Sequence, residues 1–159
     1  MLPVYHSLFQ SHILYALPVW SNLTKKQMLS LQTIQNKAIR NGFKLPKTTR
    51  VKELYTTTKL LPFEELIKVS SLIQTHNMLN NLIISNTRLD KNHDTHRYPT
   101  RTANHLRQHT SHTTKFGTNS IRNKATLLYN AIPVQYKNLN KKQFKRDIKK
   151  FIRSEYEKN

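Results

Sequence analysis

The chain has 159 residues, with 27 lysines and arginines against 8 aspartates and glutamates, and a formal net charge of +19 at pH 7. Such an excess of positive charge favours polyanionic partners, with nucleic acid first and an acidic membrane surface as its rival. The sequence contains no cysteine and two glycines, which excludes disulfides, thiolate zinc sites and cysteine nucleophiles and argues against glycine-rich phosphate loops.

Apolar residues recur at helical spacing near the start of the chain and predict a first helix over residues 3–17. A second helix is expected to begin at Thr24, which can form a capping box with Gln27, and to end at Gly42. Its predicted buried side chains are Met28, Leu31, Ile34, Ala38 and Ile39. Its polar side is expected to carry Gln32, Gln35, Lys37 and Arg40.

Two further helices are predicted, a short one near residues 49–55 and a longer one from Pro62 to about Leu82. Periodicity disappears between residues 85 and 118, then returns over residues 120–132, and a last helix opens with Asn140 as its cap. The sequence thus predicts an all-α fold of about five helices in an irregular bundle, with a long basic loop or disordered arm between the fourth and the fifth.

This pattern predicts three parts. Residues 1–84 form an N-terminal helical part, residues 85–118 a basic loop or arm rich in His and Thr, and residues 119–159 the C-terminal basic helices. The sequence contains no apolar run of about 18 residues, the length that would predict a membrane-spanning helix. The start of the chain lacks the pattern of a secretory signal. We therefore expect no membrane partner and an intracellular location, either nuclear or cytoplasmic.

No set of residues predicts an active site. Two-metal catalysis needs clustered carboxylates, and two of the three aspartates, Asp90 and Asp94, fall in the predicted loop. His105 and His109 have the spacing of a zinc-binding pair on a helix, but a polar arm that faces RNA or DNA is the favoured interpretation. We expect no metal, no cofactor and no enzymatic activity of this chain alone.

Aromatic side chains could stack on bases, as they do in proteins that bind single strands. Trp20, Tyr5, Tyr15 and Tyr129 fall on apolar patterns and are expected in the core. Tyr98 lies next to Arg97 in the predicted arm and is the strongest stacking candidate.

The last helix predicts phosphate contacts, because lysine or arginine recurs at every fourth position and Lys141 and Lys142 stand in the first turn, where the helix dipole disfavours cations. The alternative is a solvated face. The second helix and the residues after it are expected to add a basic rim. The predicted nucleic-acid-binding residues are Lys37, Arg40, Lys44, Lys47, Arg50, Arg97, Tyr98, Arg101, Arg107, Lys141, Lys145, Lys149 and Arg153.

Short motifs also occur in a fixed order along the chain. The first comprises Tyr5, Leu8, Phe9, Ser11, His12, Tyr15 and Trp20, and the second Leu31, Gln32 and residues 35–40. The third comprises Tyr98, Thr100 and Arg101, and the last Tyr129, Asn130, Ile132, Pro133, Phe144 and Lys145. This ordered set resembles the thumb and post-thumb region of reverse transcriptases from jockey-like, LINE-type non-LTR retrotransposons.

The resemblance implies a C-terminal fragment of an RNA-directed DNA polymerase polyprotein, which helps to hold template RNA or primer and target DNA. In that family the polymerase and endonuclease sites lie upstream of the matching region, and the upstream reverse transcriptase core would be a partner. Two alternatives stay open. One is a helical assembly module that docks on a polymerase core or self-associates, and the other is a non-functional remnant of an element.

Overall fold

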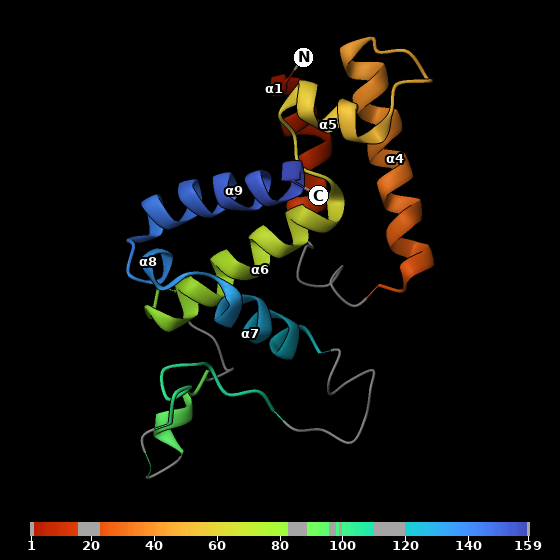
Figure 1. The fold of residues 1–159 in the computed structure, drawn as a ribbon. Helices are drawn as coiled ribbons and strands as arrows, with labels where there is room; N and C mark the ends of the chain where they lie inside the picture. The colour runs from red at the N-terminus through yellow and green to blue at the C-terminus, as the bar shows by residue number, and fades with distance from the viewer. Residues whose placement is uncertain are drawn as a thin grey trace. The chain divides into compact units, whose positions relative to one another are not determined.

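The computed structural model describes residues 2–15, 23–82, 89–95, 98, 100–109 and 120–158 (Figure 1). The elements in these ranges are α1 (Leu2–Val4), the π-helix η1 (Tyr5–Gln10), α2 (Ser11–Tyr15), α4 (Lys25–Phe43), α5 (Val51–Thr58), α6 (Phe63–Leu79), the 3-10 helix η2 (Asn92–Asp94), α7 (Ile121–Ala131), α8 (Val134–Lys137) and α9 (Lys141–Lys158). Within these ranges the only β-pairing is one isolated bridge, which confirms the all-α fold class. None of the described helices combines the length and the apolar character that a membrane span requires.

The chain forms two compact units. The first unit comprises residues 1–70 and 150–159, and the second unit comprises residues 71–149. Helices α6 and α9 each contribute residues to both units. The three parts expected from the sequence follow composition, whereas these units follow packing.

Helix α4 begins as predicted and ends later than predicted. The hydroxyl of Thr24 accepts a hydrogen bond from the Gln27 N–H, and the Gln27 side chain accepts one from the Thr24 N–H, which confirms the capping box. The helix continues through Gly42, and the residue in the left-handed conformation is Lys44, with a φ of 53°. Leu45 N–H closes this end by donating to the Arg40 carbonyl at 2.9 Å. The predicted stop at Gly42 was therefore wrong.

The first unit has an apolar core that confirms part of the predicted pattern. Ile39 is fully buried, together with Leu54 and Tyr55 of α5. Phe63 and Ile67 of α6 form a neighbouring cluster against Met28 and Leu31 of α4, which are partly buried. Ile34 was expected in this core but is 50% exposed, because α4 turns Gln35 inward instead.

Aromatic residues divide between core and surface. Tyr5 and Tyr129 are buried, as predicted, but Tyr15 is 92% exposed at the end of α2. Trp20 lies outside the described residues. Tyr98, the predicted stacking residue, is 81% exposed.

The second unit is built around an aromatic stack. The rings of His76 on α6 and Phe144 on α9 lie parallel with their centroids 3.9 Å apart, and the Tyr129 hydroxyl is 3.2 Å from His76 Nδ1. Burial raises the pKa of Tyr129 to about 12. Burial also lowers the pKa of His76, against a smaller opposing effect of the Leu139 backbone. Burial of His76 therefore favours the neutral form of its imidazole.

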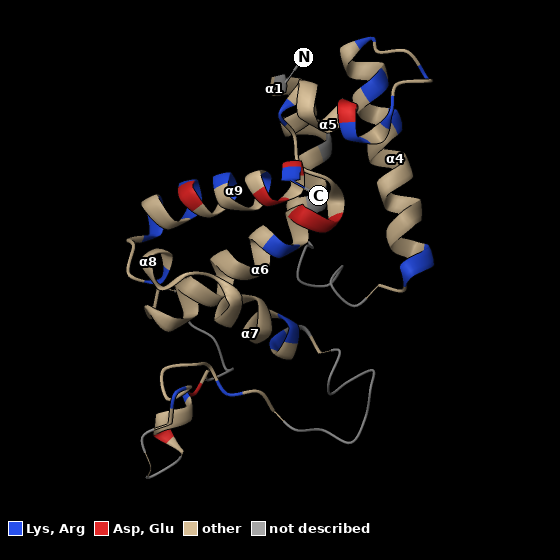
Figure 2. Cartoon of the chain, in the orientation of Figure 1, with Lys and Arg blue, Asp and Glu red and all other residues tan. Residues whose placement is uncertain are grey.

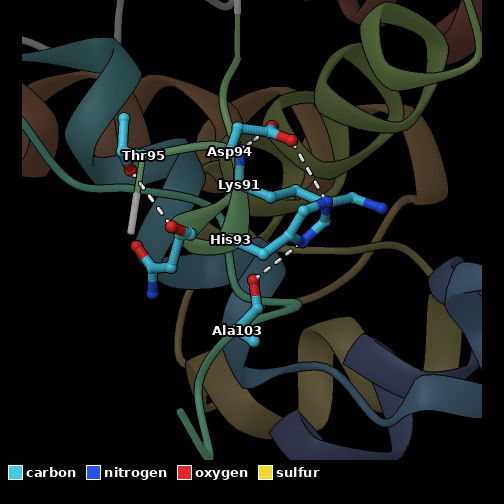
Figure 3. A network of polar contacts seen from close by, with 6 residues as sticks. Lys91, His93, Asp94, Thr95 and Ala103 are labelled. Atoms are coloured by element: carbon cyan, nitrogen blue, oxygen red, sulfur yellow. Dashed lines mark hydrogen bonds and ion pairs between the residues drawn. The ribbon is translucent and has the colours of Figure 1, made fainter. Parts of the chain in front are cut away.

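The described part of the predicted arm is a folded loop. Its two sides pair through backbone hydrogen bonds, from Asn92 N–H to the His105 carbonyl at 3.0 Å and from Arg107 N–H to the Asp90 carbonyl at 2.9 Å. On one side the His93 ring lies between Asp94 Oδ1 and the Ala103 carbonyl, each 3.1 Å away (Figure 3). Residues 89–95 and 100–107 are thus held by specific contacts.

Candidate nucleic-acid interface

The buried side-chain amides of α4 determine which face of that helix packs against the rest of the first unit. Gln35 is fully buried, and its Nε2 donates to the Tyr5 hydroxyl at 2.9 Å and to the Leu61 carbonyl at 3.0 Å. These bonds join α4 to η1 and to the residues before α6. The prediction that Gln35 lies on the polar side was therefore wrong. Its amide lies inside because the Tyr5 hydroxyl and the Leu61 carbonyl need hydrogen-bond partners there.

A second pair of amides extends this polar network. The Tyr55 hydroxyl donates to Asn36 Oδ1 at 2.7 Å, and Gln32 Oε1 accepts the N–H of Phe63 at 2.8 Å. Phe63 is the first residue of α6, where backbone N–H groups have no partner within the helix. Gln32 and Asn36 therefore hold α5 and α6 against α4. Of the four polar residues predicted on this helix, only Gln35 is fully buried; Lys37 is exposed, and Gln32 and Arg40 are half-buried.

Arg40 fixes the loop that follows α4. Its Nη2 donates to the Thr49 carbonyl at 2.8 Å, across the end of the loop. Thr49 itself closes a turn by donating its N–H and its hydroxyl to the Pro46 carbonyl at 3.1 and 2.9 Å. A guanidinium group therefore ties the loop between α4 and α5, which carries Lys44, Lys47 and Arg50, to the end of α4.

A depression lies at this junction. It has a volume of about 400 Å³ and is lined by Lys37, Arg40, Asn41 and Lys47, which we call the basic depression. Lys37 and Lys47 are exposed, and neither forms an ion pair with any carboxylate that the structure describes. Lys44 and Arg50 belong to the loop that supplies Lys47, are exposed, and also lack such an ion pair. Three of the predicted residues thus line the depression, and two more lie on the adjoining loop.

Arg153 has a role similar to that of Arg40. It is half-buried, and its guanidinium donates to the carbonyl of Lys59, the residue that caps α5 in the left-handed conformation. Arg40 holds the residue before the N-cap of α5, and Arg153 holds its C-cap. Two arginines that the sequence assigned to phosphate binding therefore have structural contacts with the backbone.

Helix α9 carries basic residues along much of its length (Figure 2). The predicted row passes from the exposed Lys141 and Lys145 to Lys149 and Arg153, which are half-buried. The neighbouring row consists of Lys142, Arg146 and Lys150 and is exposed along its length. Asp147 lies 3.0 Å from the Arg146 guanidinium and raises the pKa of that group. The first turn contains Lys141 and Lys142 and no acidic residue.

The remaining predicted residues belong to the loop of the second unit. Tyr98, Arg101 and Arg107 are exposed. Arg97, the sequence neighbour of Tyr98 and a predicted binding residue, lies outside the described residues.

Metal chemistry has no site in the described ranges. No group of three His, Asp or Glu side chains there is arranged to hold a metal ion. His105 and His109 lie on a segment without helical structure, so their spacing does not place them on one helix face. Asp94 instead binds the Lys91 N–H and contacts the His93 ring.

Sequence reasoning missed the residues that anchor the loop. Asn130 of α7 bonds the backbone of Leu106, and Asn123 bonds that of His109. Their spacing of seven positions places both on one face of α7. That spacing was available in the sequence as a signal, but the amides' partners were not.

Comparison of the chain with family models, with curated proteins and with solved structures gives no match.

Proposed function

We propose that this chain binds nucleic acid, chiefly through phosphate contacts made by the basic depression and the exposed cations of α9. The observation that carries this proposal is a group of exposed cations on the basic depression and the loop beside it. These are Lys37, Lys44, Lys47 and Arg50, and none of them forms an ion pair with a carboxylate that the structure describes. Like charges gathered this closely repel one another, and a phosphate backbone is a ligand that relieves the repulsion at several points at once.

The first turns of two helices support the same proposal. Helix α4 begins with Lys25 and Lys26, helix α9 begins with Lys141 and Lys142, and neither first turn contains an acidic residue. The positive end of a helix dipole destabilises cations at these positions by a few tenths of a kcal/mol. Phosphate groups bound near such helix starts would offset this repulsion.

The sequence motifs indicate the larger protein to which the chain would belong. Their order resembles the C-terminal part of a LINE-type reverse transcriptase, and we infer a role in holding template RNA or primer and target DNA. In this role the chain has no catalytic residues of its own. The second motif has a structural function in the first unit, because Gln35 and Asn36 form its buried polar network and Arg40 fixes the next loop.

A second candidate function is assembly on another protein surface, such as the upstream reverse transcriptase core. It is favoured by the apolar side chains of the first helical segment, where Leu8 and Tyr15 are exposed together with Val4 and Leu14. Apolar association and phosphate binding respond differently to salt, because salt weakens phosphate contacts whereas apolar burial is not screened.

The test is binding of the full chain to a labelled structured RNA and to a matched DNA duplex, followed by anisotropy from about 50 to 300 mM salt. The proposal expects log K to fall linearly with log salt, with a slope of several phosphates, and expects unlabelled RNA to compete. Salt-insensitive or absent binding to both probes would contradict it and would favour assembly. Comparison of the two probes also gives the preference between RNA and DNA.

A further inference from the structure

A cavity of about 480 Å³ lies within the second unit, where the end of α6, the loop of residues 89–109 and the segment from α7 to α8 meet. We call it the polar cavity. Its volume is within the usual range of small-ligand sites. Three cations line it, Lys91, Arg101 and Lys137, and no aspartate or glutamate does. The lining therefore favours a ligand with negative charge.

One of these cations is held firmly in place. Lys137 is half-buried, its Nζ donates to the Asn130 carbonyl at 3.3 Å, and it lies 5.6 Å from the centre of the Tyr129 ring. Burial lowers the pKa of Lys137, which reflects the cost of a charge that is partly removed from solvent and has no carboxylate partner in the described structure. Because an ammonium group has three donors, Lys137 can also bind an anion in the cavity.

The loop that supplies the other two cations is fixed before any ligand binds. Lys91 and Leu106 form the isolated bridge, and Asn130 holds Leu106 with two hydrogen bonds of 2.9 Å. Arg101 belongs to the same loop, and the Ala103 N–H donates to the Thr100 carbonyl in the turn around it. A wall fixed by backbone bonds loses little conformational freedom on binding.

The remaining lining residues indicate what else the ligand contains. Asn80, Asn104 and Asn138 add side-chain amides, each with a donor pair and an acceptor. Asn104 and Asn138 are exposed, and their side chains have no hydrogen-bond partner in the described structure. Inorganic phosphate needs only the cations, whereas the edge of a nucleobase offers adjacent donors and acceptors that match amides.

We propose that the polar cavity binds one unstacked nucleotide of a single-stranded nucleic acid, with the cations on its phosphate and the asparagine amides on its base. This inference rests on the proposed function and adds a distinction to it. The basic depression meets phosphates, which single strands and duplexes both present. The cavity admits a base only when that base has left its stack, so it gives the chain a preference for single strands.

The experiment compares two labelled probes of about 12 nucleotides, a single-stranded oligouridine and a base-paired duplex, at one salt concentration with the full chain. The variants are N104A/N138A and, separately, Arg101→Gln. The control is Gln108→Ala/Gln135→Ala, which removes two exposed amides of the same unit that do not line the cavity. Circular dichroism checks that each variant is folded.

We expect N104A/N138A to weaken binding of the single strand by about tenfold, as the loss of two hydrogen-bonding amides would, and to change duplex binding by less than about twofold. We expect Arg101→Gln to show the same selectivity. An equal effect on both probes, or none, in a chain that still binds both probes would overturn the cavity proposal and leave the proposed function intact. A wild-type chain that binds neither probe would overturn both.

A final arm separates a nucleotide within a strand from a free nucleotide. Uridine monophosphate is titrated into the chain while the side-chain amide resonances of Asn104 and Asn138 are followed by NMR. Displacement of the bound oligouridine only by unlabelled strands, with weak resonance shifts by the mononucleotide, supports the proposal. Tight binding of the mononucleotide without any preference for single strands would overturn it in favour of a free-nucleotide site.

Discussion

The side-chain amide of Asn130 forms two hydrogen bonds of 2.9 Å with the backbone of Leu106, one to its carbonyl and one from its N–H. Asn123, two turns earlier on α7, makes the same pair of contacts with His109, at 2.9 and 3.1 Å. The two amides thus act as a short partner strand for an extended segment. A loop without periodicity in its sequence is fixed to a helix in this way.

Replacement of Asn130 by alanine tests this anchor. We expect Asn130→Ala to lower the free energy of unfolding by about 1–3 kcal/mol, because two backbone groups at the buried Leu106 lose their partner. Hydrogen exchange measured by NMR should quicken at the amides of Leu106 and Arg107. The exposed Gln135→Ala is the control. Unchanged exchange at both amides in Asn130→Ala would contradict the anchoring role.

The polar network of the first unit predicts that replacing one polar residue of α4 lowers the free energy of unfolding. Gln35→Leu keeps the volume of the side chain but leaves the Tyr5 hydroxyl and the Leu61 carbonyl without their partner. We expect a loss of about 1–3 kcal/mol in chemical denaturation. The neighbouring change Ile34→Gln, at a half-exposed side chain, should remain within about 0.5 kcal/mol. Equal costs for the two variants would contradict the network.

The His76 stack predicts a dependence of stability on pH. Burial keeps the folded-state pKa of His76 below the ordinary value of 6.5, so the unfolded chain binds a proton first as the pH falls. This contribution to stability is complete above about pH 6.5 and is lost below it, with a slope of at most about 1.4 kcal/mol per pH unit. Denaturation of the wild type, of His76→Phe and of the exposed control His12→Gln should show the slope reduced only in His76→Phe.

The two arginines that hold α5 should contribute to stability, whereas neighbouring cations should contribute to RNA binding. Arg153→Met removes a contact with the Lys59 carbonyl and should lower the thermal midpoint, with little change in the salt dependence of RNA binding. Lys150→Gln, on the exposed row of α9, should leave the midpoint unchanged and reduce the salt slope by about 0.7–0.9. The reverse pattern would show that Arg153 binds phosphate and that the α5 contact is incidental.

Local signals predicted the helices well. The capping box at Thr24 and the cap at Asn140, whose Oδ1 accepts the Gln143 N–H at 2.9 Å, depend on residues three positions apart and are visible in sequence. The buried row of α9, Phe144, Ile148 and Ile152, also follows from the sequence, because strong amphipathicity leaves one choice of face. Such features do not require knowledge of distant partners.

Features that depend on distant partners were missed. Gln35 lies inside because Tyr5 and Leu61, 30 and 26 residues away, supply its hydrogen-bond partners. The described residues at the end of the loop, Leu106 and His109, are held because Asn130 and Asn123 bind their backbone from another helix. In the candidate interface, Arg40 was identified as a cation, but its contact with Thr49 follows from the three-dimensional path of the loop.

The basic depression is tested most directly by comparing two double variants that lose the same charge. Lys37→Gln/Lys47→Gln removes two lysines of the depression that form no ion pair with a described carboxylate. Lys68→Gln/Lys158→Gln removes two lysines that pair with Glu65 and Glu155. Arg40 is retained in both variants because it holds the loop. Anisotropy with a labelled structured RNA over about 50–300 mM salt gives the slope of log K against log salt for each chain.

We predict that the depression variant loses about 1.4–1.8 from the magnitude of the slope, the value for two phosphate contacts, and that the control retains the wild-type slope. If both variants show the same slope, net charge alone governs binding, and the basic depression is not the interface.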